Sequence, residues 1–128
     1  MTESALYPQI MQAFSNGPTR VFRQQSMMAW AGKILNRTPT TVTLLNPRAI
    51  KVGTPGISDL GGFTSELITP DHFGQRVAIY LAIEGKGPHT PTTTEQKDFI
   101  AMVRSHGGRA GIARSVEDAA RIIRGEKI

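Results

Sequence analysis

The most apolar run in the chain covers residues 77–83, with the sequence VAIYLAI. Such a run predicts a central β-strand that is covered on both faces. Two charged residues, Glu84 and Lys86, follow it directly, so the strand is expected to end there. A strand of this kind requires outer layers, and we therefore expect an α/β fold in which helices flank a mixed central sheet.

The rest of the sequence supplies candidate helices and shorter strands around this run. Apolar residues at helical spacing predict a helix over 4–16. A second helix is expected to open at Thr92 or Thr93, since each has capping-box spacing, and to end at Gly107-Gly108. Its buried stripe is Phe99, Ile100 and Val103, and Gln96 lies on that stripe one turn earlier, so its amide is expected to point toward the sheet. A last helix is expected to start at Ser115, with its apolar face made of Val116, Ala119, Ala120 and Ile123.

Strands are predicted at 19–24, at 40–45 with an extension over 49–52, and at 109–114. The segment 27–30 is expected to be irregular, and the strand at 40–45 is expected to end at Asn46-Pro47. With 13 Gly and 8 Pro, the chain has too many turn formers for a helical bundle. We expect one domain over residues 1–128 with the element order αβββαβα.

Basic residues dominate the first half of the chain. Between Glu3 and Asp59 there is no acidic residue, whereas the same stretch contains Arg20, Arg23, Lys33, Arg37, Arg48 and Lys51. The net charge is +5, and a polyanion such as nucleic acid is the expected partner, although a merely basic surface would give the same pattern. Arg20, Arg23, Arg48, Lys51 and Lys97 are the candidate phosphate contacts.

The chain has no Cys, so disulfides, thiolate metal sites and a Cys nucleophile are excluded. No stretch is long and apolar enough to predict a membrane span, and no basic-then-apolar segment opens the sequence. We therefore expect a cytoplasmic protein with no membrane partner. Residues 53–56 lack the Gly-Lys-Ser/Thr ending of a phosphate-binding loop, and no motif predicts an organic cofactor.

Three charged residues stand where charges need a partner or a cation. Asp59 follows a glycine-rich turn, and Glu84 and Lys86, two residues apart on a strand, project from the same face. Two carboxylates on neighbouring strands with a lysine beside them would form a Mg²⁺ site for phosphodiester hydrolysis. The alternative is a surface pair, Glu84 with Lys86, next to an unrelated Asp59. His72, His89 and His106 show no metal-ligand spacing, and each is more typical of a surface or hydrogen-bonded histidine.

The sequence resembles the virus-type replication-repair nuclease (VRR-NUC) domain, a branch of the PD-(D/E)xK nuclease superfamily. The resemblance covers residues 3–124 and rests on four motifs in order: Gly53-x-x-Gly56-x-Ser58-Asp59-Leu60, Ala82-Ile83-Glu84-Gly85-Lys86, Thr94-Glu95-Gln96-x-x-Phe99-Ile100, and Gly107-Gly108-x-Ala110-Gly111-x-Ala113-Arg114-Ser115. It implies a restriction-endonuclease-like fold of the stand-alone phage or prophage type, acting in the cytoplasm of a bacterial host.

Site roles follow from the resemblance residue by residue. Asp59 and Glu84 are implied metal ligands, together with the backbone carbonyl of Gly85, and Lys86 is the implied catalytic lysine. Gln96 matches the family's glutamine beside the site, and Glu3 falls where the family often has an acidic residue in its first helix. Ser58 stands where the superfamily's name has Pro, and Gly85 replaces the usual apolar residue, which removes an anchor beside the lysine.

These inferences together predict an endonuclease for DNA that depends on Mg²⁺ or Mn²⁺. The resemblance further implies a preference for branched substrates such as Holliday junctions. The alternative is a basic DNA-binding module that keeps the fold without cleaving. A homodimer is expected, because two symmetric cuts resolve a four-way junction. Met27, Met28, Trp30, Ile34 and Leu35 are candidates for its interface, or else for the core of the monomer.

Overall fold

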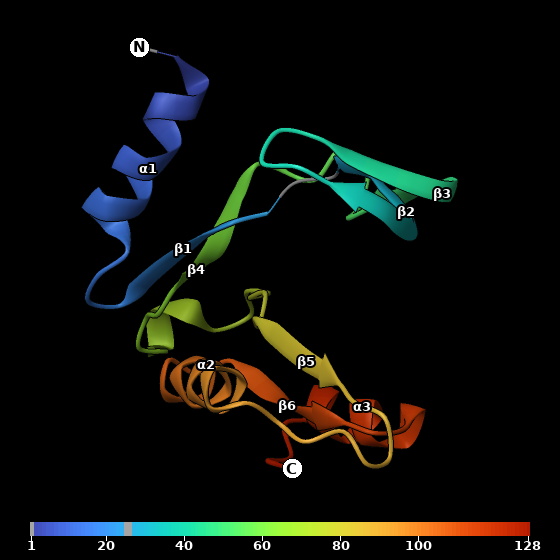
Figure 1. Ribbon diagram of the computed structural model, residues 1–128. Coiled ribbons are helices and arrows are strands. Elements are labelled where there is room, and N and C mark those ends of the chain that lie inside the picture. The colour runs from blue at the N-terminus through green and yellow to red at the C-terminus, as the bar shows by residue number, and fades with distance from the viewer. Residues whose placement is uncertain (1, 25–26) are drawn as a thin grey trace. The chain divides into compact units, whose positions relative to one another are not determined.

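The computed structural model describes residues 2–24 and 27–128 and divides the chain into two compact units (Figure 1). The first unit comprises Met1–Asn16 and Arg20–Gly62, and the second comprises Gly17–Thr19 and Phe63–Ile128. Helices and strands occur in both, so the chain is a mixed α/β protein, as predicted.

The first unit opens with helix α1, Glu3–Phe14, where a helix was predicted. Thr2 caps this helix, since its side-chain oxygen accepts a hydrogen bond from the backbone N–H of Ala5. The chain then enters strand β1, Thr19–Arg23, which pairs with strand β4, Leu60–Thr64. Asp59 directly precedes β4, and its backbone carbonyl accepts a hydrogen bond from the Gln24 N–H just after β1. The backbone at Asp59 is therefore held in place where β4 begins.

A long antiparallel hairpin, β2 (Met27–Arg37) with β3 (Val42–Val52), replaces the irregular segment and the short strand predicted there. The prediction that a strand ends at Asn46-Pro47 is wrong. The pairing shifts register between Ala31 and Lys33, where Asn46 takes a left-handed φ of 49°. A bulge of this kind accommodates Pro47, which has no N–H to donate. Gly32 is required opposite it, because a Cβ there would lie 2.8 Å from the carbonyl oxygen of Leu45.

The second unit is built on two parallel strands, β5 (Leu81–Gly85) and β6 (Arg109–Ala113), joined by helix α2 (Thr94–Ser105) as the crossover. A 3₁₀ turn, η1 (Pro70–His72), precedes β5, and helix α3 (Val116–Ile123) follows β6. Ile100 and Val103 of α2 pack on Ala110 of β6, with Phe63, Tyr80, Ala82, Phe99, Met102 and Ile112 around them.

The predicted central strand is wrong in its bounds and in its burial. Strand β5 begins at Leu81 and includes Glu84 and Gly85, because its length is set by β6, which starts only after the Gly107-Gly108 turn. Side chains alternate between half-buried and exposed along β5, and Ile83 is 41% exposed. The strand is therefore not covered on both faces.

Helix α2 follows the prediction, and α3 departs from it. Thr93 is the N-cap of α2 and forms the capping box with Gln96, the second of the two predicted alternatives. In α3, Ala119 and Ala120 are half-buried as predicted, but the predicted apolar face is wrong at its ends, because Val116 is 89% and Ile123 46% exposed while Ile122 is fully buried. Gly111 explains this rotation: a Cβ there would lie 2.9 Å from Ile122, so the missing side chain makes the space into which Ile122 packs.

Over the described residues, the strands form three two-stranded sheets in place of the single mixed sheet that was expected. Five of the described strands precede α2 where the predicted order has three, because β2 replaces the predicted irregular segment and β4 was not predicted. The finer topology of the nuclease superfamily remains a prediction. None of the helices in the described ranges, 2–24 and 27–128, is both long and apolar enough to cross a membrane.

Candidate active site

Glu84, Lys86 and Gln96 meet at the carboxyl end of β5. The Lys86 Nζ lies 3.8 Å from Glu84 Oε1, and the Gln96 Nε2 donates a 2.8 Å hydrogen bond to the same oxygen. The Lys86 side chain is only 11% exposed, while that of Glu84 is 38% exposed. A lysine side chain that is mostly withdrawn from solvent thus stands beside a carboxylate that solvent and a ligand can reach.

The backbone around this cluster is held on both sides. The Lys86 N–H donates to the Ala113 carbonyl at 3.0 Å, which extends the β5–β6 pairing one residue past Gly85 and points Lys86 to the same face as Glu84. Arg114, which follows β6, donates from its guanidinium to the Gly87 carbonyl. Sequence reasoning assigned no role to this contact, which fixes the loop just after Lys86.

Gln96 is fixed by the start of α2. Its Oε1 accepts a 3.0 Å hydrogen bond from the Thr93 N–H, and the Thr93 side chain accepts from the Gln96 N–H at 3.2 Å. With the carbonyl end of its amide held by the cap, the amide nitrogen is left to face Glu84. The amide points toward the sheet, as the helical spacing predicted.

A hollow of about 400 Å³ opens beside the cluster. Glu84 and Gln96 line it together with the apolar side chains of Ala82, Phe99 and Ile100. Glu84 Oε1 already has two partners, whereas Oε2 has no hydrogen-bond or ion-pair partner among the described residues and is available to a ligand.

Asp59 belongs to the first unit, where helix α1 provides its neighbour. The Tyr7 hydroxyl donates a hydrogen bond to Asp59 Oδ2. The Arg23 guanidinium lies over the Tyr7 ring, 4.7 Å from its centroid. Sequence reasoning did not find Tyr7: a tyrosine on a helix carries no pattern that relates it to an aspartate 52 residues later.

The donor set fits a hard divalent cation, since the carboxylates of Asp59 and Glu84 and the carbonyl of Gly85 offer only oxygen. Within the described residues, no three His, Asp or Glu side chains converge as a ready metal site. Asp59 and Glu84 lie in different units, so their joint coordination of one ion remains a proposal. Glu3 starts α1, and its side chain lies outside the described part of the structure.

The candidate phosphate contacts are distributed over the fold. Arg20 and Arg23 lie on β1, Arg48 and Lys51 lie on β3, and Lys97 lies on α2. Arg48 and Lys51 are three residues apart in a regular stretch of β3, so they project from opposite faces of the hairpin. Lys97 belongs to the second unit and the other four residues to the first, so a shared phosphate-binding surface stays a prediction.

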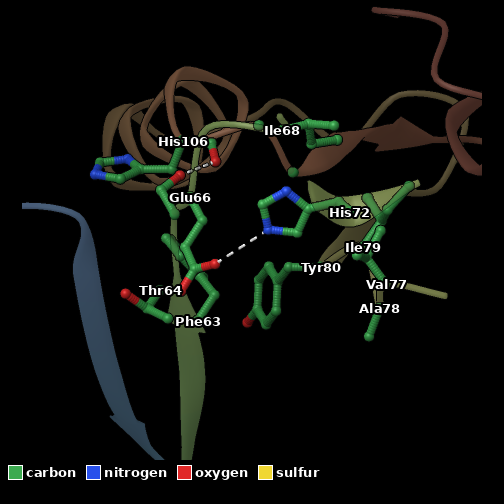
Figure 2. Close-up of a pocket in the computed structure, with 13 residues that line it drawn as sticks. Phe63, Thr64, Glu66, Ile68, His72, Val77, Ala78, Ile79, Tyr80 and His106 are labelled. Carbon is green, nitrogen blue, oxygen red and sulfur yellow. Dashed lines mark hydrogen bonds and ion pairs between the residues drawn. The ribbon is translucent and has the colours of Figure 1, made fainter. Parts of the chain in front are cut away.

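A second hollow of about 240 Å³ lies in the second unit (Figure 2). His72, Glu66, Tyr80 and His106 line it, and none of the candidate catalytic residues does. The His72 Nδ1 accepts from the Thr69 N–H at 3.0 Å and its Nε2 lies 3.7 Å from Glu66. His106 contacts the Met102 carbonyl at 2.9 Å. These contacts give His72 and His106 structural partners.

Comparison with known protein families matches residues 2–117 to the VRR-NUC domain. The match spans α1, all six strands and the start of α3, and it includes every candidate catalytic residue. No curated protein and no solved structure matches the chain.

Proposed function

The chain belongs to the VRR-NUC family of nuclease domains, whose substrate class is DNA, and from that premise we propose that it is an endonuclease that cleaves branched DNA with Mg²⁺ or Mn²⁺. It acts on four-way junctions as a homodimer, in the cytoplasm of the bacterial host of a phage or prophage that encodes it.

The observation that carries this proposal is the cluster of Glu84, Lys86 and Gln96. A surface ion pair would leave both partners exposed, whereas the Lys86 side chain is 11% exposed beside a more accessible carboxylate. Withdrawing most of a lysine side chain from solvent next to a ligand-accessible carboxylate has an energetic cost that a structural surface pair does not require. This arrangement supports a nuclease site over an incidental surface pair.

Each residue has a distinct task in the proposed mechanism. Asp59, Glu84 and the Gly85 carbonyl hold the cation, and when bound the cation polarises the scissile phosphate and activates water. Lys86 positions the attacking water and offsets the negative charge that develops on the phosphate. Gln96 holds Glu84 by Oε1, so the carboxylate keeps one orientation and its other oxygen is left for the cation.

Substitution of the two carboxylates tests the site. Asp59→Asn and Glu84→Gln each remove ligand charge at nearly constant volume, so the fold and DNA binding should persist while cleavage is lost. The expected loss exceeds the 10- to 100-fold effect typical of residues that only support a metal ligand. Asp98→Asn is the matched control, since it removes an exposed carboxylate of α2 and should cleave like the parent protein.

The measurement is gel analysis of a labelled four-way junction, a flap and a plain duplex, each with and without Mg²⁺. The proposal predicts Mg²⁺-dependent incision that is fastest on the junction. Full activity in either carboxylate variant would refute the site. Tight binding of all three substrates without incision by the parent protein would instead indicate the non-catalytic DNA-binding module.

A further inference from the structure

The backbone around Asp59 is tied to β1 by a series of hydrogen bonds within the first unit. The Gln24 N–H donates to the Asp59 carbonyl at 2.8 Å, and the Gln24 side chain donates to Ser58 Oγ at 3.3 Å. Ser58 Oγ in turn donates to the Leu60 carbonyl at 2.8 Å. The main chain on both sides of Asp59 is therefore held, and what remains free is the rotation of its carboxylate.

Tyr7 removes that remaining freedom. Its hydroxyl donates to Asp59 Oδ2 from the second turn of α1. Asp59 Oδ1 has no hydrogen-bond partner among the residues that the structure describes, and the side chain is only half-buried. One oxygen is thus fixed by the protein while the other stays open to a ligand.

The Tyr7 ring has a second neighbour that holds it in place. The Arg23 guanidinium lies over one face of the ring at 4.7 Å from the centroid, a cation–π geometry. This contact limits rotation of the ring and so keeps the hydroxyl aimed at Asp59. The same contact places Arg23, a basic residue of β1, next to Tyr7, which in turn contacts Asp59.

We propose that Tyr7 is a positioning residue that orients the Asp59 carboxylate for a divalent cation. The inference rests on the proposed function, in which Asp59 is a cation ligand. A carboxylate that is already oriented loses less rotational freedom when the ion binds, so the hydrogen bond raises affinity for the ion. Tyr7 itself touches neither the ion nor the DNA.

The test is a Mn²⁺ titration of the full chain without DNA, followed by the electron paramagnetic resonance signal of free Mn²⁺. Tyr7→Phe removes only the hydroxyl and keeps the ring under Arg23, so it should weaken Mn²⁺ binding about tenfold. Its thermal unfolding midpoint without metal should stay near that of the parent. Ser105→Ala is the control, because it removes a hydroxyl that donates to the Met102 carbonyl at the C-terminal end of α2, away from the candidate site, and it should bind Mn²⁺ like the parent.

Cleavage assays measure the metal dependence of the reaction, which would not change if Tyr7 only stabilised the fold. In Tyr7→Phe, the Mn²⁺ concentration for half-maximal cleavage should rise about tenfold, while the rate at saturating Mn²⁺ stays within about twofold of the parent. A fall in the saturated rate at unchanged metal dependence would overturn the inference.

The double variant separates this inference from the function on which it rests. If Tyr7 acts through Asp59, Tyr7→Phe should cause no further loss of Mn²⁺ affinity in an Asp59→Asn background. Weak binding in Asp59→Asn with parental binding in Tyr7→Phe would refute the role of Tyr7 and leave the metal site intact. Parental binding in Asp59→Asn would overturn both.

Discussion

Glu84 Oε1 is the atom on which two different side chains converge, the mostly buried side chain of Lys86 and the amide of Gln96, which the start of α2 holds in place. The ammonium supplies charge, whereas the amide supplies direction. Since the two partners share one oxygen, they leave the second oxygen of the carboxylate accessible. Loss of Lys86 and loss of Gln96 are therefore expected to affect cleavage in different ways.

Lys86→Ala should lower turnover much more than metal affinity. Lys86 contributes charge next to the reacting phosphate, and removing a donor of this kind typically costs about 10²- to 10³-fold in rate. Single-turnover cleavage at saturating Mn²⁺ measures the turnover rate, and calorimetry with Mn²⁺ measures the metal affinity. A loss of metal binding as complete as that of Asp59→Asn would contradict this division of roles.

Gly85→Val is the matched variant for Lys86→Ala. A Cβ at Gly85 would have no atom within 4 Å among the described residues beyond its two chain neighbours, and the substitution leaves the backbone carbonyl unchanged. The variant should therefore fold and cleave about as well as the parent, because only the carbonyl of Gly85 is assigned a role. A large loss of cleavage with an intact fold would show that the absence of a side chain at this position matters.

At the scale of one element, the capping box at the start of α2 both stabilises the helix and orients Gln96 toward Glu84. Thr93→Ala removes the cap acceptor and should lower the free energy of unfolding by about 1 kcal/mol. Its cleavage should stay near that of the parent, because the Thr93 N–H still holds the Gln96 side chain. Gln96→Ala removes half of the capping box and also the hydrogen bond to Glu84, so it should lower cleavage about tenfold.

Urea unfolding and cleavage rates measured on both variants separate the two effects. The expected result is comparable stability in Thr93→Ala and Gln96→Ala with unequal activity. Equal losses of activity would mean that the helix start acts on the site only through stability, and the contact between Gln96 and Glu84 would then have no role of its own.

The sequence patterns predicted correctly those features that depend on residues close together in the chain. The cap at Thr93 and the turn at Gly107 follow from hydrogen bonds within a few residues, and the shared face of Glu84 and Lys86 follows from strand geometry. The Tyr7 contact with Asp59 joins residues far apart in the chain, so no local pattern reveals it.

The errors in the predicted fold arise where a neighbouring helix or strand determines the structure of an element. The rotation of α3 that buries Ile122 depends on the missing side chain of Gly111 in β6. The length of β5 depends on where β6 begins. The hairpin continues through Asn46-Pro47 because β2 provides a glycine opposite the bulge. Each outcome depends on residues that are distant in sequence, which a reading of consecutive positions does not weigh.

At the scale of the whole molecule, the exposed apolar residues of the hairpin bear on assembly. Met27, Met28, Trp30, Ile34 and Leu35 are 50%, 60%, 63%, 49% and 56% exposed, so they do not form a core of their own unit. A shallow hollow of about 800 Å³ lies among Trp30, Ile34, Val42, Leu44 and Pro47. Trp30 and Ile34 are the two of the five exposed residues that line it, and exposed apolar side chains that border one hollow are typical of an interface.

A homodimer through this surface is the expected outcome, and it has a functional reason. One site cuts one strand, whereas resolution of a four-way junction needs two cuts related by symmetry, which a two-fold dimer places on one substrate. Light scattering at micromolar concentration should therefore give about twice the monomer mass of 13.9 kDa. Trp30→Glu puts a charge on the most exposed of the five residues and should give the monomer mass.

The same variant connects assembly to the chemistry. A Trp30→Glu monomer keeps Glu84, Lys86 and Gln96 in their own unit, so it should still nick one strand of a junction while losing paired incision. Parent protein that runs at 13.9 kDa and nevertheless makes paired, symmetric cuts would contradict the dimer. Parent dimers whose Trp30→Glu variant remains dimeric would place the interface elsewhere on the chain, because a buried unpaired carboxylate at its centre would not be tolerated.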